Sequence, residues 1–362
     1  MKEFFFDSNL PSAPMPNAVH QFVSSVRWSN RQFARTDDVQ GTMIHFQKCY
    51  STMQEMFQKE SCRLSALFRD LHAEIRFLDI ACAPGGFSQF LLDHFPNSSG
   101  SGITLPESLG GFPVIVNGDH RYQLCYFDLL SHPLDPTPQT SESVDIVIGD
   151  AQYFPRTQEA VDEYGGRKAG TVTGGRIGLL LREFILAFEA LKPGGVFIFR
   201  FVAWEKIHAN ILKLFFLCFD MFDSVEPFKS EYQHTADCTF YAVCSGFRRE
   251  KYLADDIQTD LRVAYARVVL SPPFAAVHNG TINCVQVIDH PSAGSRVQRP
   301  DPVLDKPDAH ILESLYSFRK IEKHEHFAKA CAMFNYVYKM FLIGQSSYTD
   351  HSTRSHRDRG DF

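Results

Sequence analysis

Between residues 75 and 250 the chain alternates short apolar runs with longer segments of helical spacing, and this alternation constrains the fold most strongly. Apolar runs without an alternating polar face are typical of strands that are covered on both sides. Strands that alternate with helices pair in parallel through crossover connections. The sequence therefore predicts an α/β fold with a doubly wound, mostly parallel sheet. The predicted strands are 75–80, 100–105, 123–129, 144–150, 196–202 and 239–247, and the predicted helices between them are 87–95, 178–192 and 208–219.

The remaining segments define the expected domain organisation. Residues 1–42 are irregular, and one or two helices are predicted within 43–71 at the start of a domain that spans 43–249. The helix–strand pattern decays after residue 250, so 250–345 is expected to be a C-terminal extension that is only partly helical. Residues 346–362 are polar and predicted to be a disordered tail.

Composition limits the classes of protein to consider. With 362 residues and 44% hydrophobic content, the chain can bury a sizeable core. A net charge of -6 argues against a generally cationic nucleic-acid-binding surface, although it leaves room for a local basic groove. The nine cysteines contain no CxxC pair, which argues against a zinc site or a disulfide framework and favours an intracellular compartment, cytoplasmic or nuclear. No apolar run is long enough for a membrane span.

The stretch "FLDIACAPGGFSQFLL" places a carboxylate and a glycine pair between a predicted strand and a predicted helix. In open α/β sheets, ligands bind at the carboxyl ends of the strands, where Asp79 lies. Gly85 and Gly86 are expected to let the backbone pass close to a ligand. The loop lacks the spacing and the lysine of phosphate-binding loops, so it suits a ligand with an amino-acid tail and a ribose, such as S-adenosylmethionine. The alternative is a tight turn in which Asp79 caps a local group.

Further segments make the chain similar to one known family. "LDIACAPGGFSQFLL" resembles the first motif of the FtsJ-type RNA 2′-O-ribose methyltransferases, and "GSGITLP" resembles the second-strand segment of their cap-methylating branch. "VDIVIGDAQ", "LREFILAFEALKPGGVFIFRF" and "EPFKSEYQHTADCTFYAVCSGF" are similar to later parts of the same domain. The resemblance covers residues 43–247 and implies a class I methyltransferase: a Rossmann-like, seven-stranded sheet with a helical C-terminal extension.

The resemblance also implies that S-adenosylmethionine is the cofactor and RNA the partner. It places the following residues at the cofactor: Asp79, Ala81, Cys82, Ala83, Pro84, Gly85, Gly86, Phe87, Thr104, Asp128 and Asp150. Where the family often has a ribose-binding acid, this chain has Ile103 or Thr104, and Glu107 lies nearby. Ala81 replaces a family glycine, a change that costs little if the backbone angle there is ordinary.

Catalysis in this family uses a Lys-Asp-Lys-Glu tetrad, which the chain matches only in part. Asp150 matches the family's aspartate, whereas Arg200 stands at the central lysine and Thr239 at the glutamate. Arginine keeps its proton and cannot act as a base, although it can hold a nucleophile, a phosphate or Asp150. Asp237 is a possible substitute for the glutamate, and the first lysine is Lys48 or Lys59.

Two other groups of residues allow both a functional and a purely structural interpretation. Residues 165–168 and 174–176 are rich in glycine and basic side chains, so they predict a flexible loop that either closes over a substrate or merely connects two elements. His324 and His326 in "KHEHF" would lie on different faces of a helix, which favours a solvated surface over a metal pair.

Three hypotheses for function follow. The first is methylation of an RNA ribose 2′-hydroxyl. The second is a degenerate family member that binds cofactor or RNA without turnover, which Arg200 and Thr239 favour. The third is a small-molecule or peptide methyltransferase on the same scaffold, which the acidic balance favours.

Overall fold

The computed structural model describes most of the chain between residues 39 and 270, together with part of a later segment. The described residues are 39–62, 64–116, 120–130, 144–152, 169–202, 209–230, 239–270, 326, 329, 330, 332, 333, 336 and 337.

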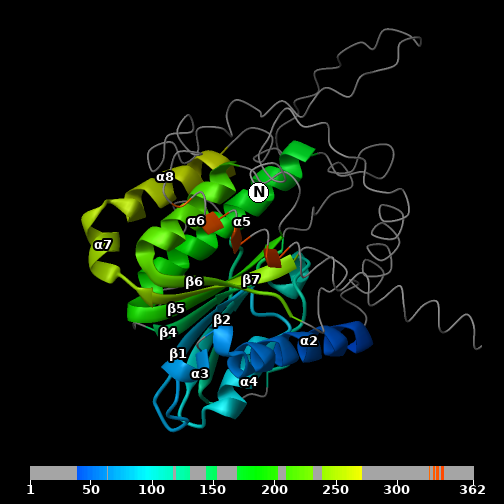
Figure 1. Ribbon diagram of the computed structural model, residues 1–362. Coiled ribbons are helices and arrows are strands. Elements are labelled where there is room, and N and C mark those ends of the chain that lie inside the picture. The colour runs from blue at the N-terminus through cyan, green and yellow to red at the C-terminus, as the bar shows by residue number, and fades with distance from the viewer. Residues whose placement is uncertain are drawn as a thin grey trace, which may run out of the picture.

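Helices and strands alternate along these ranges (Figure 1). The strands are β1 (Arg76–Ile80), β2 (Ser99–Thr104), β3 (Tyr122–Tyr126), β4 (Val144–Gly149), β5 (Leu191–Val202), β6 (Phe222–Phe228) and β7 (Thr239–Phe247). The helices are α2 (Val39–Gln58), η1 (Glu60–Cys62), α3 (Leu64–Leu67), α4 (Gly86–His94), η2 (Glu107–Leu109), α5 (Ala169–Ala190), α6 (Ala209–Met221), α7 (Arg249–Ala254) and α8 (Ile257–Val269).

One seven-stranded sheet organises the molecule, in the order β3-β2-β1-β4-β5-β7-β6. The first five strands of this order pair in parallel, whereas β7 runs antiparallel between β5 and β6. The prediction of a doubly wound, mostly parallel sheet is therefore confirmed. Because the carboxyl ends of the parallel strands lie at one edge, the turns that follow β1, β2, β3 and β4 are gathered there beside the end of β5.

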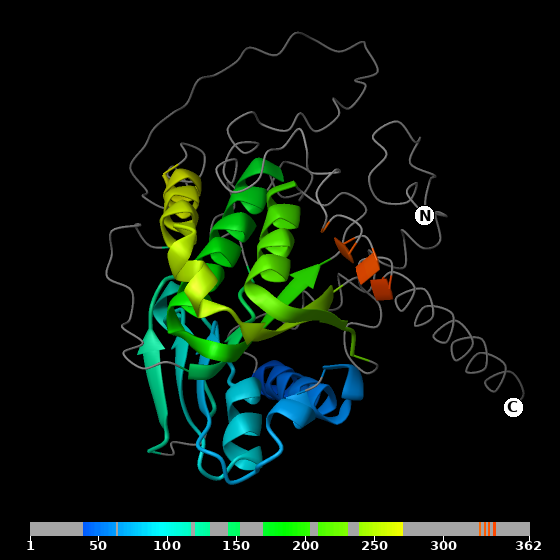
Figure 2. The same cartoon turned by 60° about the vertical axis from the view of Figure 1, so that its left-hand side comes forward.

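Helices cover both faces of the sheet, as the two views show (Figures 1 and 2). On one face α2 and α4 pack over an apolar cluster that includes Met53, Phe90 and Ile148. On the other face α5, α6, α7 and α8 pack over a larger cluster centred on phenylalanines such as Phe184 and Phe199. Both faces of the central strands are thus buried, which is why these strands read as continuous apolar runs.

The structure adds two helices directly after β7 that the sequence pattern did not predict. Helices α7 and α8 follow β7 directly, and Leu261 and Tyr265 of α8 lie in the same core as α5. The hydroxyl of Tyr265 donates a hydrogen bond to the backbone oxygen of Leu129 (2.7 Å). Charges at helix ends and polar side chains obscured the apolar spacing of these two short helices. In the described part of the chain, no helix has both the length and the apolar character needed to cross a bilayer.

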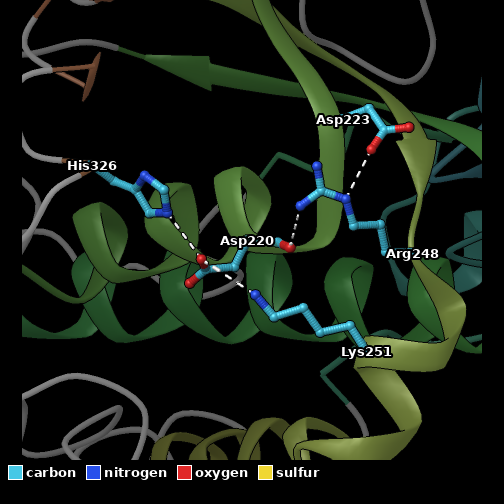
Figure 3. Close-up of polar contacts among 5 residues, drawn as sticks. All are labelled: Asp220, Asp223, Arg248, Lys251 and His326. Atoms are coloured by element: carbon cyan, nitrogen blue, oxygen red, sulfur yellow. Dashed lines mark hydrogen bonds and ion pairs between the residues drawn. The ribbon is translucent and has the colours of Figure 1, made fainter.

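His326 corrects one expectation, because it is buried and not part of a solvated surface. Its Nε2 lies 2.9 Å from Oδ1 of Asp220, near the end of α6, and Lys251 of α7 approaches the same oxygen at 3.6 Å (Figure 3). Arg248 pairs with Asp223 beside this group. His326 thus joins the later segment to α6, and Lys251 joins α7 to the same carboxylate. His324 lies outside the described residues.

The long helix before β5 also begins earlier than predicted. Residues 174–176, expected in a flexible loop, belong to α5, whereas residues 165–168 lie outside the described part of the chain. Glycine lowers helix propensity by only about 1 kcal/mol per residue, which the packing of the following apolar turns can offset. Prediction from Gly174 and Gly175 alone therefore placed the helix start too late.

Candidate active site at the carboxyl edge of the sheet

Backbone hydrogen bonds hold the strand ends together at this edge. The amide of Cys82, in the turn after β1, donates to the oxygen of Ile103 in β2 (3.0 Å). The amide of Asp150, directly after β4, donates to the oxygen of Ile80 in β1 (3.2 Å). The amide of Phe127, after β3, donates to the oxygen of Thr104 (2.8 Å). The edge is therefore a set of turns whose relative positions are fixed by the sheet.

Asp79 is a completely buried carboxyl group in β1. Its Oδ2 accepts a hydrogen bond from the hydroxyl of Ser88 in α4 (2.6 Å), whereas its Oδ1 has no partner among the described residues. Burial raises the pKa of Asp79 to about 7, partly offset by the bond from Ser88 and reinforced by the charge of Asp150. A buried acceptor atom without a donor is a costly arrangement that a donor of a ligand would relieve.

The two glycines after Asp79 are required by the chain's own packing. Gly85 has φ +105° and its Cβ would fall on the side chain of Val116. A Cβ on Gly86 would meet the backbone of α2, with the amide of Tyr50 only 2.7 Å away. The missing side chain of Gly86 therefore has a packing role that the sequence did not indicate, because it lets α2 lie directly on the start of α4.

The substitution of alanine for the family's glycine at position 81 was expected to cost little if the backbone angle there was ordinary, and that angle is not ordinary. The φ of Ala81 is +62°, in the left-handed region, where a residue with a Cβ is strained by about 1–2 kcal/mol. The turn after β1 therefore retains the backbone of a glycine position although the residue is alanine.

The other residues expected at the cofactor take several kinds of position. Cys82, Pro84 and Phe87 are buried in the turn after β1 and the first turn of α4, and Ala83 is half-buried. Thr104 ends β2 and is buried, and the carboxylate of Asp128 accepts the amide of Leu130 (3.0 Å) and so closes the turn after β3. Glu107, the alternative acid, lies in η2.

Asp150 and Arg200 form an ion pair at the centre of the edge. Arg200 Nε lies 2.8 Å from Asp150 Oδ1, and the two side chains are only 5% and 8% exposed. Arg200 also donates to the backbone oxygen of Asp150 (3.0 Å), and the Gln152 amide oxygen, once turned toward the guanidinium, accepts from it at 2.6 Å. Burial alone would lower the pKa of Arg200, but the charge of Asp150 and other nearby groups raises it by a larger amount. The pKa is therefore higher than its ordinary value, and the guanidinium stays charged.

Tyr241 completes this arrangement and was not singled out from the sequence. Its hydroxyl donates to Asp150 Oδ1 (3.3 Å), and its Cα is paired with that of Arg200 across β5 and β7. Burial and the charge of Asp150 raise the pKa of Tyr241, so the hydroxyl remains protonated. The only signal in the sequence was its place in the apolar run of β7, which does not distinguish it from a core residue.

Glu183 of α5 is a second buried carboxyl group that sequence reasoning missed. Its Oε1 accepts the amide of Ala151 (2.7 Å) and lies beside Gly149. Burial raises the pKa of Glu183 to about 8. It therefore supports the backbone that carries Asp150. A signal was available, because Arg182 and Glu183 are two charges inside an otherwise apolar helical run.

The helix α2 reaches Asp150 through His45 and Cys49. Lys48 is exposed, whereas its neighbour Cys49 is buried. His45, Cys49 and Asp150 each offer an atom within 4.8 Å of those of the other two. Lys59 pairs with Glu55 (3.5 Å) and lies over the ring of Phe228, beyond the other end of α2.

Thr239 and Asp237 are the expected replacements for the family's glutamate. Thr239 begins β7 and is buried, and its backbone oxygen accepts a hydrogen bond from Lys229 (2.7 Å). Asp237 lies outside the described residues. The described residues thus bring together Asp150, Arg200, Tyr241, His45 and Cys49.

Comparison with known proteins assigns a family to this domain. A model of the FtsJ-like methyltransferase family matches residues 48–247. Among solved structures, a provisionally assigned ribosomal RNA methyltransferase from Plasmodium falciparum is 19% identical, with 52% of this chain and 94% of that chain covered and a TM-score of 0.34. Human methyltransferase-like protein 13, solved in complex with SAH, is 15% identical, with 63% and 93% covered and a TM-score of 0.31. No curated protein matches significantly.

Proposed function

The chain belongs to the FtsJ-like methyltransferase family, and we propose that it methylates a ribose 2′-hydroxyl of RNA. Members of this family are S-adenosylmethionine-dependent methyltransferases. The observation that carries the proposal is the buried pair of Asp150 and Arg200 at the end of β4 and β5. A methyl donor and a hydroxyl acceptor that meet there would find a fixed carboxylate and a fixed cation.

The residues present fit the cofactor on one structural ground, the unpaired Oδ1 of buried Asp79. An ammonium group would supply the hydrogen bond and the positive charge that this atom lacks. We assign the amino-acid part of the cofactor to the turn 81–87, and the remainder to Thr104, Asp128 and Asp150. When bound, S-adenosylmethionine supplies an electrophilic methyl group on a sulfonium sulfur.

Within this proposal Arg200 is an anchor for Asp150. A buried guanidinium that bonds to both the carboxylate and the backbone oxygen of Asp150 fixes the carboxylate's position. It cannot accept the proton of the acceptor hydroxyl. We therefore infer that the incomplete Lys-Asp-Lys-Glu tetrad is a rearranged catalytic site. In sequence this site is nearest to the cap-methylating branch.

A second candidate is binding of cofactor or RNA without turnover. The specific observation that favours it is the charged state of Arg200, which removes the family's proton acceptor from the position where lysine stands. This candidate predicts cofactor affinity and no methyl transfer.

The test is transfer of a radiolabelled methyl group from S-adenosylmethionine to a short capped RNA, the same RNA without a cap, total RNA and a metabolite extract. We expect label in RNA, recovered after alkaline hydrolysis in dinucleotides, because a methylated 2′-oxygen cannot attack the adjacent phosphate. Asp150→Ala should abolish incorporation, whereas Asp255→Ala, at an exposed position after α7, should retain it.

Each of the other outcomes contradicts a definite part of the proposal. Label in mononucleotides would mean methylation of a base. Label only in the metabolite extract would support a small-molecule enzyme. Calorimetric binding of the cofactor without label in any substrate would support the second candidate.

A further inference from the structure

The side chain of His45 lies beside the carboxylate at the centre of the site. His45 and Cys49 are one helical turn apart on α2, with 4.0 Å between His45 Nε2 and Cys49 Sγ. Both are within 4.8 Å of an oxygen of Asp150. His45 is half-buried, so its ring is in contact with the site without being sealed into the core.

Several titratable or charged groups surround this imidazole. Asp150, directly after β4, lies near the imidazole. Its carboxylate bonds to Arg200 of β5 and to Tyr241 of β7. Lys48 and Cys49 flank it on α2. The centroid of the Phe112 ring lies 6.3 Å from that of the imidazole.

These neighbours differ from His45 in their capacity to take up a proton near neutral pH. Burial raises the pKa of the Cys49 thiol and of the Tyr241 hydroxyl well above their ordinary values, so both remain protonated. Arg200 remains charged. An imidazole, by contrast, ordinarily exchanges its proton close to neutral pH.

Two carboxyl groups with a near-neutral pKa lie nearby but are poorly placed to act on a substrate. Asp79 is completely buried and bonded to Ser88, and Glu183 is 2% exposed and bonded to the amide of Ala151. A group that receives a proton from a substrate must be within hydrogen-bond reach of it. Half-buried His45 meets this condition better than either carboxyl group does.

We propose that His45 is the general base of this enzyme, in place of the lysine that Arg200 has replaced. The inference rests on the proposed function. The acceptor's O–H bond breaks and its proton passes to a ring nitrogen of His45. The oxygen forms a bond to the methyl carbon, and the sulfur keeps the electron pair of the broken S–CH₃ bond. The adjacent carboxylate of Asp150 stabilises the imidazolium that forms.

A metal ion is a competing use for the same residues, since imidazole, thiolate and carboxylate are zinc ligands. One observation disfavours it. The Cys49 thiol is held protonated by burial, whereas zinc requires the thiolate.

The test compares the parent, His45→Gln, His45→Ala and the exposed control His72→Gln on the capped RNA, as kcat and KM against pH. We expect kcat of the parent to rise with pH through a single inflection, as the base loses its proton. His45→Gln should lower kcat by about 100-fold and remove the inflection. Added imidazole should restore part of the rate to His45→Ala, whereas the control should match the parent.

Two further measurements do not depend on turnover. Calorimetry should give the same cofactor affinity for His45→Gln and the parent, within about twofold. In the ligand-free parent, the rate at which diethyl pyrocarbonate modifies His45, followed by mass spectrometry, should rise with pH as the neutral ring is populated. A rate independent of pH would overturn the proposal.

The outcomes separate this inference from the proposed function. A parent that methylates no RNA overturns the proposed function and the inference with it. An active parent whose rate and pH profile survive His45→Gln overturns the inference alone. Activity that is lost to a chelator and restored by Zn²⁺, with one zinc ion bound per chain, would replace the base with a metal site.

Discussion

Arg200 and Tyr241 are paired across two antiparallel strands and both bond to the same carboxylate oxygen of Asp150. The pairing exists because β7 is inserted between β5 and β6. Residues opposite each other on adjacent strands point to the same side of the sheet. Asp150 is thereby fixed from two strands, and a change at either partner should be felt at the carboxylate.

Arg200→Lys tests whether this fixed carboxylate depends on the guanidinium. A lysine cannot reproduce a fork that bonds to both the side chain and the backbone of Asp150, so we expect methyl transfer to fall by about tenfold. Initial rates on the capped RNA measure this, with Arg248→Lys, in the exposed pair with Asp223, as the control. A higher rate in Arg200→Lys, and higher still with Thr239→Glu, would show instead that the family's lysine and glutamate are what the enzyme lacks.

Asp79→Asn should change how stability depends on pH. Burial raises the pKa of Asp79 from an ordinary 3.8 to about 7. Between these values the folded state binds more protons than the unfolded state, so the free energy of unfolding falls as pH rises through this window. Asparagine does not titrate, so Asp79→Asn should stabilise the ligand-free protein at neutral pH by up to a few kcal/mol. The free energy of unfolding should also depend less steeply on pH.

Urea denaturation of the ligand-free parent and variant at a series of pH values measures this effect. Glu183, with a pKa raised to about 8, contributes a fall of the same sign in both proteins. The same substitution should weaken cofactor binding, because Asp79 would lose its charge. Parallel stability curves for parent and variant would contradict the assignment of Asp79 as the titrating group.

Ala81→Gly should stabilise the protein. The left-handed backbone at φ +62° strains alanine but not glycine, and this relief exceeds the entropy that glycine adds to the unfolded chain. We expect a gain of about 0.5–1 kcal/mol in the free energy of unfolding. The control Ala73→Gly, where φ is not positive, should instead lose stability. Equal losses in both variants would refute strain at Ala81.

Asp220→Asn should loosen the attachment of the later segment. Its carboxylate meets His326 at 2.9 Å and Lys251 at 3.6 Å (Figure 3), and removing the charge leaves a buried imidazole with a weaker partner. We expect the free energy of unfolding to fall by about 1–3 kcal/mol. The matched change Asp223→Asn removes only an exposed pair with Arg248, so it should cost less than about 1 kcal/mol. Proteolysis near residue 326 should also quicken only in Asp220→Asn.

Prediction from the sequence succeeded where a local pattern reflects burial. Strands such as β4 and β5 are covered on both faces, so continuous apolar runs in the sequence predicted them. Their alternation with helices then predicted a parallel sheet. It failed where the deciding contact joins distant parts of the chain. The packing of α2 against Gly86 was not predicted, because nothing in the local sequence indicates it. His45 and Tyr241 reach Asp150 only through folding, so neither carries a local signal.

Because α8 packs against α5, the domain that folds is longer than the segment that matches the family. The family match ends at residue 247, yet Leu261 and Tyr265 complete an apolar layer over the sheet. Arg182 of α5 stacks on the Tyr265 ring (4.7 Å), and Arg262 of α8 pairs with Glu189 of α5 (2.6 Å). A fragment cut at the end of the recognised domain would expose this layer to water and aggregate, so recombinant work on the enzyme has to carry the chain past α8.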